Sequence, residues 1–340
     1  NDTFDGLASG KIQYIGNNYV DVANYGWLGL MSHVHYCDGY VYTASDFGET
    51  DSTSGIWKIK TGPSVSYGNN GYFLKLEDRS NLDLDSGTNA FSFTTTGTVV
   101  ATYDNPSNNF ATWNRVGTAR VGGGSLRPTT YTQGNNTLSL GSGGYFSRAT
   151  GTLGVSAGKW YWETKCVSGT ASGDPSIGII GSDGDQTNYI GATGNSSMVM
   201  NDSGQKGYNN AGDTSYGSSY GDGDIVGVAL DLDNKAIYLS INNAWQDSGD
   251  PTSGASVTGA MYSGTGTSDG FDPATQFWTP FCIGDSAGPS VLASNFGNGY
   301  FGTTAVTSAE ADGDGIGAFE YAPPTGYFTL CTKNIKAYGG

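Results

Sequence analysis

Short runs of apolar and aromatic residues alternate with clusters of Gly, Asn, Asp and Ser along almost the whole chain. An apolar period of 3.6 residues rarely persists long enough for a helix, so the pattern predicts strands and loops. Asp233 and Asn234 form a two-residue polar break between two strands, which predicts a tight hairpin. Strands are expected at residues 71–76, 90–95, 98–103, 159–167, 176–180, 225–231, 236–241, 277–283 and 290–296.

Two of these runs carry a clear alternation of side chains. Trp160 and Trp162 flank Tyr161, so both indoles point to one face of a strand and are expected in the core. The same alternation places a second group of core residues on one face of another strand: Val226, Val228 and Leu230. Small residues between them, Gly227 and Ala229, leave the opposite face free for the close approach of a second layer.

A shift in composition divides the chain. Strands are evenly spaced after residue 159, whereas residues 104–158 are rich in Asn, Thr, Ser and Gly. The expected organisation is a β-rich N-terminal segment (1–67), a connecting arm (68–115), one large β-sandwich (116–335) and a tail (336–340). The first segment is too short to cover its own apolar residues, so we expect it to be an assembly element that favours a homo-oligomer over packing within one chain.

Composition supports an all-β protein and excludes some partners. Gly contributes 55 of 340 residues, aromatic residues 13% and charged residues only 14%, which is typical of many turns and few helices. The net charge of −16, without a basic patch, argues against nucleic acid. No stretch approaches the ~20 apolar residues that would cross a bilayer, so no membrane insertion is expected.

Residues 158–163 (GKWYWE), 177–179, 207–210, 215–217 and 223–231 resemble, in this order, the SPRY (B30.2-like) domain. Residues 237–242 and 295–297, with Phe301, resemble its later strands. The resemblance covers roughly residues 140–305 and implies a concanavalin-A-like jelly roll, an antiparallel sandwich of two sheets, with Phe296 in the core.

A second resemblance lies outside that region. Residues 36–39, 45–49, 55–58 and 67–74, then 106–112, 321–327 and 330–332, resemble junctions in tail-fibre and other virion proteins of marine bacteriophages. In those proteins the first junction closes a laminin-G-like sandwich, so residues 1–67 are expected to be a partial laminin-G-like segment. The resemblance implies a virion or extracellular location and other virion proteins as partners.

Catalytic chemistry finds little support in the sequence. His33 and His35 alternate around Val34 and could share a metal, but no third ligand is near, so surface or interface histidines are favoured. A Ser-His-Asp or Cys-His arrangement would have to recruit one of these two histidines, and no strand carries two of the five Glu residues at a spacing that suits a glycosidase. Asp231 and Asp233 have such a spacing, but a turn-capping role is favoured for Asp233. We assign no catalytic residue and expect no enzyme.

Metal and disulfide chemistry are also weakly indicated. Three Asp-Gly-Asp runs, at 183–185, 222–224 and 312–314, suit turns. The third run with its nearby Glu is the candidate for Ca²⁺, through Glu310, Asp312 and Asp314, and no other cofactor is expected. Four cysteines lie far apart (Cys37, Cys166, Cys282 and Cys331). Disulfide pairing stays open, and burial as small apolar side chains is the favoured interpretation.

Aromatic residues in loops are the best candidates for binding, because a flat apolar ring suits sugars and protein partners alike. The candidates are Tyr189, Tyr208, Tyr216, Tyr220, Trp245 and Tyr262. The SPRY resemblance implies structural roles for Tyr208 and Tyr216, which leaves Tyr189, Trp245 and Tyr262 as the expected ligand contacts.

The function expected from these observations is that of a non-enzymatic virion structural protein, a phage tail-fibre or head-decoration component. The alternative is a lectin-like adhesin that binds a host-surface glycan and would show sugar binding as an isolated protein. A polysaccharide-active enzyme comes third and would need turnover that one carboxylate substitution abolishes.

Overall fold

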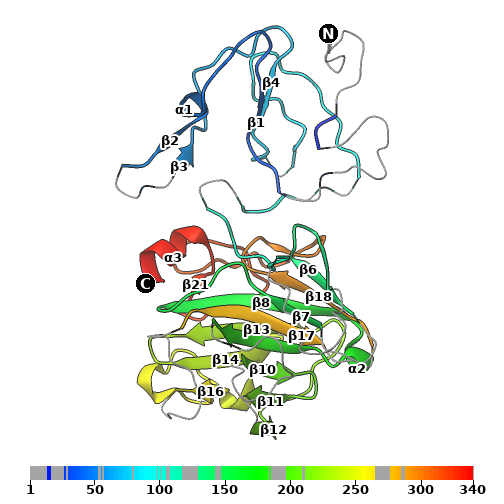
Figure 1. The fold of residues 1–340 in the computed structure, drawn as a ribbon, viewed down its shortest axis with the longest axis vertical. Helices are drawn as coiled ribbons and strands as arrows, with labels where there is room; N and C mark the ends of the chain where they lie inside the picture. The colour runs from blue at the N-terminus through cyan, green and yellow to red at the C-terminus, as the bar shows by residue number, and fades with distance from the viewer. Residues whose placement is uncertain are drawn as a thin grey trace.

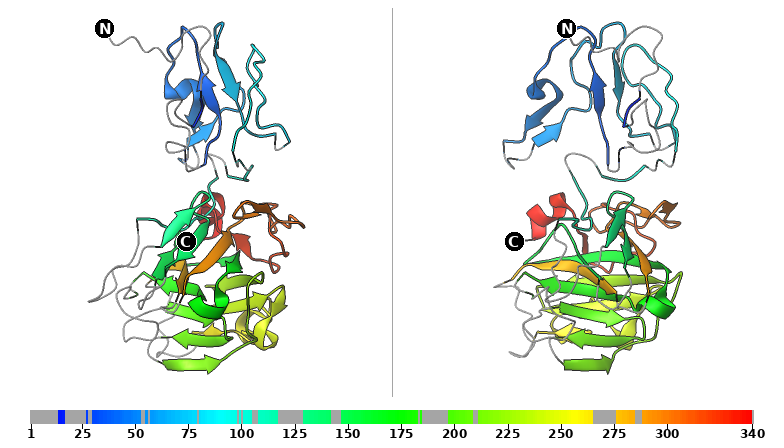
Figure 2. Two further views of the ribbon diagram at one scale, coloured as in Figure 1. Left: turned by 90° about the vertical axis from the view of Figure 1, so that its right-hand side faces the viewer. Right: turned by 45° about the vertical axis from the view of Figure 1, so that its right-hand side comes forward.

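The structure is a computed structural model of the chain. It describes residues 14–16, 27, 30–52, 55, 57–78, 80–97, 99, 101–104, 108–116, 129–141, 147–182, 184, 197–208, 211–264, 276–284 and 288–339. An N-terminal unit comprises the described residues from Tyr14 to Val99, and a larger β-sandwich comprises those from Asn108 to Gly339. Figures 1 and 2 show the N-terminal unit stacked on one end of the sandwich.

Two sheets form the sandwich in the described part of the chain. The smaller sheet has the strand order β12 (Ala211–Ser215), β11 (Gln205–Tyr208), β10 (Ser197–Asn201), β9 (Ser176–Gly181), β17 (Trp278–Gly284) and β7 (Ser147–Thr150). The larger sheet has the order β15 (Ala244–Trp245), β14 (Ala236–Ile241), β13 (Ile225–Asp231), β8 (Lys159–Ser168), β18 (Ser290–Asn295), β6 (Thr137–Leu140) and β5 (Thr130–Thr132). It also contains β16 (Tyr262–Ser263) beside β14, and β21 (Phe328–Thr329), which runs parallel to β8. The expected all-β antiparallel sandwich is confirmed.

Shorter elements complete the described structure. The small strand pairs are β1 (Val34–Tyr36) with β4 (Tyr72–Leu74), β2 (Gly48–Thr50) with β3 (Trp57–Ile59), and β19 (Tyr300–Phe301) with β20 (Thr304–Ala305). The helices are α1 (Ala44–Phe47), α2 (Thr170–Gly173) and α3 (Thr332–Tyr338), with 3-10 turns η2 (Gln246–Ser248) and η3 (Gly254–Ser256). Among the residues described, no helix is long and apolar enough to span a membrane.

The main core lies between the two sheets. On β8 and β13, Trp160 pairs with Leu230 and Trp162 with Val228, so alternation places all four side chains on the inner face. Each is at most 1% exposed. The complete predicted set is buried in this core, which confirms the prediction: Trp160, Trp162, Val226, Val228, Leu230 and Phe296.

A second, smaller core lies on the opposite face of the larger sheet. Tyr161 and Ala229 contribute to it from β8 and β13, and Phe319 and Tyr327 from the C-terminal segment. Gly227 is required here, because an added Cβ would lie 2.5 Å from the Ser240 hydroxyl and 3.0 Å from that of Tyr161. The expected second layer is therefore residues 310–330, which the sequence did not identify.

Six of the expected strands agree with observed strands at their bounds to within one residue: β8, β9, β13, β14, β17 and β18. The strand expected at 71–76 shortens to β4, and residues 90–95 contribute only a single bridge from Ser92 to Leu84. The expectation for 98–103 falls partly outside the described residues, and its described residues form no strand.

The hairpin between β13 and β14 is present, but it is not a two-residue turn. Asp231 pairs with Ala236, so four residues connect the strands. Lys235 takes a positive φ of 55° in this connection. The turn is longer than predicted because Leu232, an apolar residue, belongs to the loop and is buried beneath it in the main core.

The expected domain boundaries also change. β1 pairs with β4 across the proposed boundary at residue 67, and the buried carboxylate of Asp85 accepts hydrogen bonds from the N–H groups of Phe73 and Phe91, each at 2.9 Å. At the other end of the supposed arm, Phe110 and Trp113 are buried in the main core. The arm is therefore divided between the two units. Likewise, α3 extends past residue 335 and includes part of the expected tail.

Candidate functional site

The β1–β4 sheet of the N-terminal unit carries aromatic rings on both faces. His35 on β1 stacks on Phe73 of β4 with ring centroids 4.0 Å apart, and the Tyr67 hydroxyl lies 2.9 Å from His35 Nδ1. On the other face Tyr36 pairs with Tyr72, at 5.5 Å between centroids. Alternation along strands of only three residues thus makes both faces apolar.

A series of ring contacts leads from this sheet to the surface. The ring centroid of Phe47 lies 4.7 Å from that of His35, and the ring of Tyr42 meets Phe47 edge-on at 5.9 Å. Tyr40 stacks beside Tyr42 at 6.1 Å. These separations are those of stabilising aromatic pairs. The series ends at Tyr40, whose side chain is 51% exposed.

Two further apolar side chains lie exposed beside this series. Val41 is 98% exposed, and Trp57 on β3 is 40% exposed. The Trp57 ring covers Gly48, the residue after Phe47, so closely that a Cβ on Gly48 would come within 2.0 Å of Trp57 Cζ2. We name Tyr40, Val41 and Trp57 the N-terminal apolar surface.

Charged groups near this surface are engaged within their own unit. Lys58 forms an ion pair with Asp51, and Lys60 Nζ donates to the carbonyl oxygen of Ser45 at 2.7 Å. The Asp46 carboxylate accepts from the Thr43 N–H, and this hydrogen bond holds the pKa of Asp46 below its usual value. These charged groups therefore have partners within the unit, whereas Tyr40, Val41 and Trp57 remain exposed to solvent.

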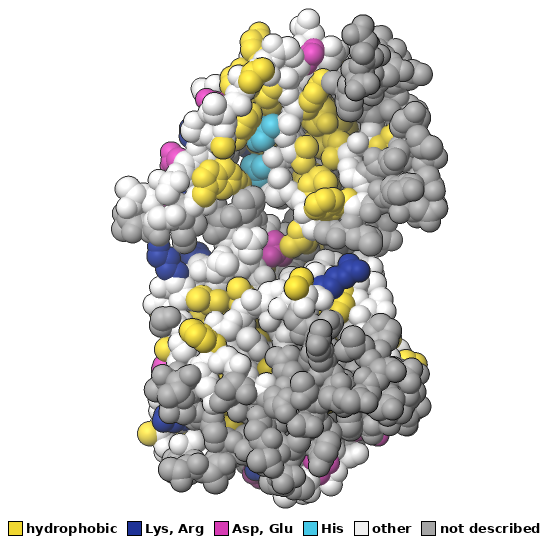
Figure 3. Space-filling view, in the orientation of Figure 1, with side chains coloured by type: hydrophobic (Ala, Val, Ile, Leu, Met, Phe, Trp, Pro, Cys, Tyr) yellow, Lys and Arg dark blue, Asp and Glu magenta, His cyan; other side chains and the backbone are white. Residues whose placement is uncertain are grey.

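Few of the apolar residues described in the N-terminal unit are buried. Of its described apolar side chains, three are buried: Tyr67, Phe73 and Leu74. Ten large ones are exposed: Tyr14, Trp27, Leu30, Met31, Tyr40, Val41, Trp57, Leu84, Phe91 and Val99. Figure 3 shows hydrophobic side chains on this unit flanking the two histidines. Exposed apolar surface on this scale is typical of an interaction site.

The two histidines contribute to this aromatic region in different ways. His33 has a positive φ of 51°, which breaks the expected alternation, and its Nε2 lies 3.3 Å from the Glu77 carboxylate. Burial lowers the pKa of both imidazoles, that of His35 to about 4. Within the described ranges no three His, Cys, Asp or Glu side chains gather as metal ligands.

The residues suggested for calcium are not assembled into a site. Asp312 is buried, and its Oδ1 accepts from the N–H groups of Asp314 and Ile316 at 3.0 and 2.9 Å. Its Oδ2 accepts from the Thr329 N–H at 2.8 Å and from Asn334 Nδ2 at 2.9 Å. Asp312 therefore holds the C-terminal segment together. Glu310 and Asp314 are exposed. The run at 183–185 lies mostly outside the described residues.

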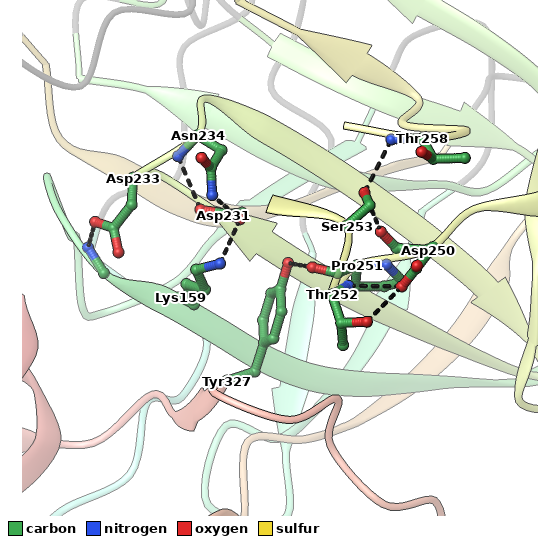
Figure 4. A network of polar contacts seen from close by, with 11 residues as sticks. Lys159, Asp231, Asp233, Asn234, Asp250, Pro251, Thr252, Ser253, Thr258 and Tyr327 are labelled. Carbon is green, nitrogen blue, oxygen red and sulfur yellow. Dashed lines mark hydrogen bonds and ion pairs between the residues drawn. The ribbon is translucent and has the colours of Figure 1, made fainter. Parts of the chain in front are cut away.

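A network of polar contacts surrounds the β13–β14 turn on the outer side of the larger sheet (Figure 4). Asp231 accepts from the Asn234 N–H at 2.9 Å and pairs with Lys159 Nζ at 2.9 Å. Asp233 instead accepts from the distant Gly158 N–H at 2.8 Å. Asp231 therefore caps this turn, and not Asp233 as the sequence suggested.

Glu163 is a fully buried carboxylate on β8 of the larger sheet. Its side chain is fully buried and accepts from the N–H groups of Glu320 and Tyr321, at 2.9 and 2.8 Å, and from the Tyr161 hydroxyl at 3.1 Å. Burial raises its pKa to about 7, against the opposing effect of these donors. The arrangement fastens the C-terminal segment onto the sheet.

The four cysteines are free in the structure. Cys166, Cys282 and Cys331 are buried, as expected for small apolar side chains, and Cys37 is half-buried. Burial raises the pKa of the Cys166 and Cys282 thiols, which keeps them in the unreactive protonated form.

Comparison with known proteins now identifies part of the chain. The sequence model of the SPRY domain family matches residues 159–265, from β8 to the strand β16. Residues 159–265 form a SPRY domain. A solved structure that matches part of the chain is the SPRY domain of human HERC1, at 16% sequence identity and a TM-score of 0.38, covering 49% of this chain and 92% of that one. No curated protein sequence matches the chain.

The aromatic residues expected to bind a ligand are not gathered at one place on the SPRY domain. Trp245 pairs with Ser240 on β14 and packs against the outer core, whereas Tyr262 pairs with Ile237 and packs against the main core, on the opposite face. The Tyr262 ring also lies 5.1 Å from Lys206 Nζ. Tyr189 lies outside the described residues.

Two other tyrosines of the SPRY domain are structural. Tyr220 is buried and donates to the carbonyl oxygens of Pro175 and Met200, at 2.6 and 3.0 Å. Tyr216 is buried and donates to the carbonyl oxygen of Gly259 at 3.2 Å. The N-terminal apolar surface, outside the matched domain, is thus the clearest candidate for binding, and it lies within the segment 1–67 that was expected to be an assembly element.

Proposed function

We propose that this protein is a non-catalytic binding and assembly protein whose N-terminal apolar surface docks against a second copy of the chain. The observation that carries the proposal is the imbalance in the N-terminal unit, which buries three described apolar side chains and exposes ten large ones. Association with another chain removes such surface from water, which stabilises the complex by about 25 cal/mol per Å² of apolar area buried. A second copy is favoured because it presents the same surface, as an isologous contact requires.

The finer proposal is a structural component of a virion, in a phage tail fibre or head decoration, with other virion proteins as partners and an extracellular location. The junction motifs around residues 36–74 and 321–332 support it, as does the acidic net charge of −16. SPRY domains are in general protein-interaction modules, which agrees with a binding role. The buried carboxylates Glu163, Asp231 and Asp312 are engaged in holding the fold, which speaks against the polysaccharide-active enzyme.

Paired substitutions test the assembly role in the full chain. Val41→Ser with Trp57→Ser alters the N-terminal apolar surface, and the matched control is Val167→Ser with Phe277→Ser, which alters side chains 46% and 56% exposed on the sandwich. We expect light scattering to give an oligomeric mass for the native chain and the control, and a monomer for the first variant. A monomeric native protein at high concentration, or an unchanged mass in the first variant, would refute the proposal.

Truncation is a poorer test than substitution. Removing residues 1–67 would separate β1 from β4 and unpair the sheet on which the surface is built. The virion role needs its own measurement: labelled antibodies against the protein should decorate a particle or filament in electron micrographs. If the antibodies label no particle or filament, the virion role is contradicted, and the proposed self-association is not affected.

A further inference from the structure

A cavity of about 370 Å³ lies where the N-terminal unit meets the sandwich. Leu30 reaches it from the N-terminal unit, and a Cβ on Gly134, in the β5–β6 turn, would lie 3.6 Å from Leu30 Cδ2. Figure 3 shows the narrow waist between the units in which this region lies. Its lining is formed by Leu30, Asp104, Asn109, Phe110, Thr112, Gly134, Asn135, Thr152 and Leu153.

Several polar groups of the lining are available to a ligand. The side-chain amides of Asn109 and Asn135 and the hydroxyl of Thr112 form no hydrogen bond with another residue of the described chain. Their backbones are fixed, since Asn109 exchanges hydrogen bonds with Thr332 and the Asn135 carbonyl accepts from the Trp113 N–H at 2.9 Å. Each free amide supplies both donors and an acceptor.

Asp104 adds a carboxylate to these groups. One of its oxygens accepts from the Phe110 N–H at 3.0 Å, which holds the side chain at the cavity wall. Phe110, Leu30 and Leu153 supply apolar surface beside the polar groups. A sugar ring presents the same combination, hydroxyls at its edge and C–H groups on its faces.

The β5–β6 turn shows that this part of the wall is held in an unusual conformation. Gln133, Gly134 and Asn135 all take positive φ, of 53°, 66° and 65°. Two of the three carry a Cβ, so the conformation is costly and is maintained by the surrounding structure. The turn places Asn135 in the lining and Gly134 beneath Leu30.

The charges of the lining narrow the class of ligand. Among the described residues, the lining contains no Lys, Arg or His, so a phosphate or carboxylate would find no described cation there. The described part of the lining contains one carboxylate, that of Asp104, which is too few for a divalent cation. Its volume falls at the lower end of the ~300–1,000 Å³ typical of small-molecule sites. We infer that the cavity between the two units binds a neutral saccharide of one or two sugar units. The inference does not depend on the proposed self-association.

The experiment uses the full chain and a panel of neutral hexoses, N-acetylhexosamines and their disaccharides, with a uronic acid for comparison. Saturation-transfer NMR identifies a binder, and titration calorimetry measures its affinity. We expect binding of at least one neutral sugar and weaker or no binding of the uronic acid. Binding of no neutral sugar, or preference for the uronic acid, overturns the inference.

Variants locate the site. Asn109→Ala removes an exposed side chain without hydrogen bonds in the described structure and should weaken binding ~3- to 10-fold. Asp104→Asn should weaken it ~10-fold or more, because a charged acceptor is lost. The control is Thr132→Ala, an exposed β5 residue outside the lining, which should bind as the native protein does. Unchanged affinity in Asn109→Ala places the sugar elsewhere and overturns the inference. Light scattering on the same samples reports self-association separately.

Discussion

Individual side chains on β8 serve two different cores. Trp160 and Trp162 enter the space between the sheets, while Tyr161 enters the outer core beneath the C-terminal segment. The sequence predicts the first from alternation alone, because two large rings must share a face. It does not predict the burial of Tyr161, since the residues that cover it come from more than 150 positions later in the chain.

Truncation of Trp160 tests the main core. The indole is fully buried, and its Nε1–H donates to the Ala157 carbonyl oxygen at 2.7 Å. Trp160→Ala should lower the free energy of unfolding by about 3–5 kcal/mol, since a cavity adds to the lost transfer energy. Urea unfolding measures this. Trp27, 62% exposed, is the matched control, and Trp27→Ala should cost under about 1 kcal/mol. Equal costs would place Trp160 outside the core.

Glu163 should make stability depend on pH in an unusual direction for a carboxylate. Its pKa is raised from 4.5 to about 7 by burial, so the folded state holds the proton more tightly than the unfolded state. Its contribution is fully present below pH 4.5 and is lost as the pH rises through about 7. The neighbouring Tyr161 and Tyr321 have raised pKa values and do not titrate in this window.

A comparison with Glu163→Gln isolates this effect from the other carboxylates. The amide of the variant is neutral at every pH, so any loss of stability caused by the substitution itself is the same at every pH and cancels when the two pH dependences are compared. Relative to the variant, the native protein should lose up to about 3 kcal/mol of unfolding free energy between pH 4.5 and pH 8, at ~1.4 kcal/mol per pKa unit. Urea unfolding at several pH values provides the curves. Parallel curves for the two proteins would show that Glu163 keeps an ordinary pKa.

At the scale of elements, the C-terminal segment and α3 depend on Asp312. Its four hydrogen bonds join the 312–316 loop, β21 and the buried Asn334 of α3. Asp312→Ala leaves these donors unpaired and should cost at least about 3 kcal/mol, with faster hydrogen exchange in α3. Asp314→Ala is the control, because it removes an exposed acceptor of one hydrogen bond, from Tyr338. Normal exchange in α3 of the first variant would contradict this role.

The effect of calcium on stability is a second test of the role of Asp312 in the C-terminal segment. Because protein donors occupy both oxygens of Asp312, millimolar Ca²⁺ or a chelator should leave the thermal midpoint of the protein unchanged. A rise of several degrees with Ca²⁺, abolished in Asp312→Ala, would instead support the calcium site that the Asp-Gly-Asp spacing suggested. The spacing itself cannot distinguish these cases, since a turn that accepts its own N–H groups and a metal loop use the same residues.

The predicted strands were accurate where local sequence determines them. In β13 and β14, apolar alternation over six or seven residues coincides with the observed bounds. β1 and β4 have three residues each and are paired by a contact between distant segments, which no local pattern reveals. The sequence likewise does not show where Trp245 and Tyr262 lie relative to each other: both pair with β14, yet their side chains pack on opposite faces of the sheet. The cavity residues come from segments of both units, so only the fold brings them together.

For the whole molecule, the two units differ sharply in how much they bury. The sandwich contains every core cluster found among the described residues, the largest of which includes four tryptophans. In its described residues the N-terminal unit has two separate two-stranded sheets, β1–β4 and β2–β3, and three buried apolar side chains. Isolated two-stranded sheets are marginally stable, so this unit should unfold before the sandwich.

Self-association should then stabilise the first transition and not the second. A partner that binds only the folded N-terminal unit raises its stability by mass action, so the midpoint of the first transition should rise by roughly 3–6 °C for each tenfold increase in protein concentration. Calorimetry at several concentrations measures both transitions. The Val41→Ser, Trp57→Ser variant should lose the concentration dependence, and the Val167→Ser, Phe277→Ser control should retain it. A first transition that is independent of concentration in the native protein would mean that the exposed apolar residues do not serve assembly, because removing them from water must stabilise the unit that carries them.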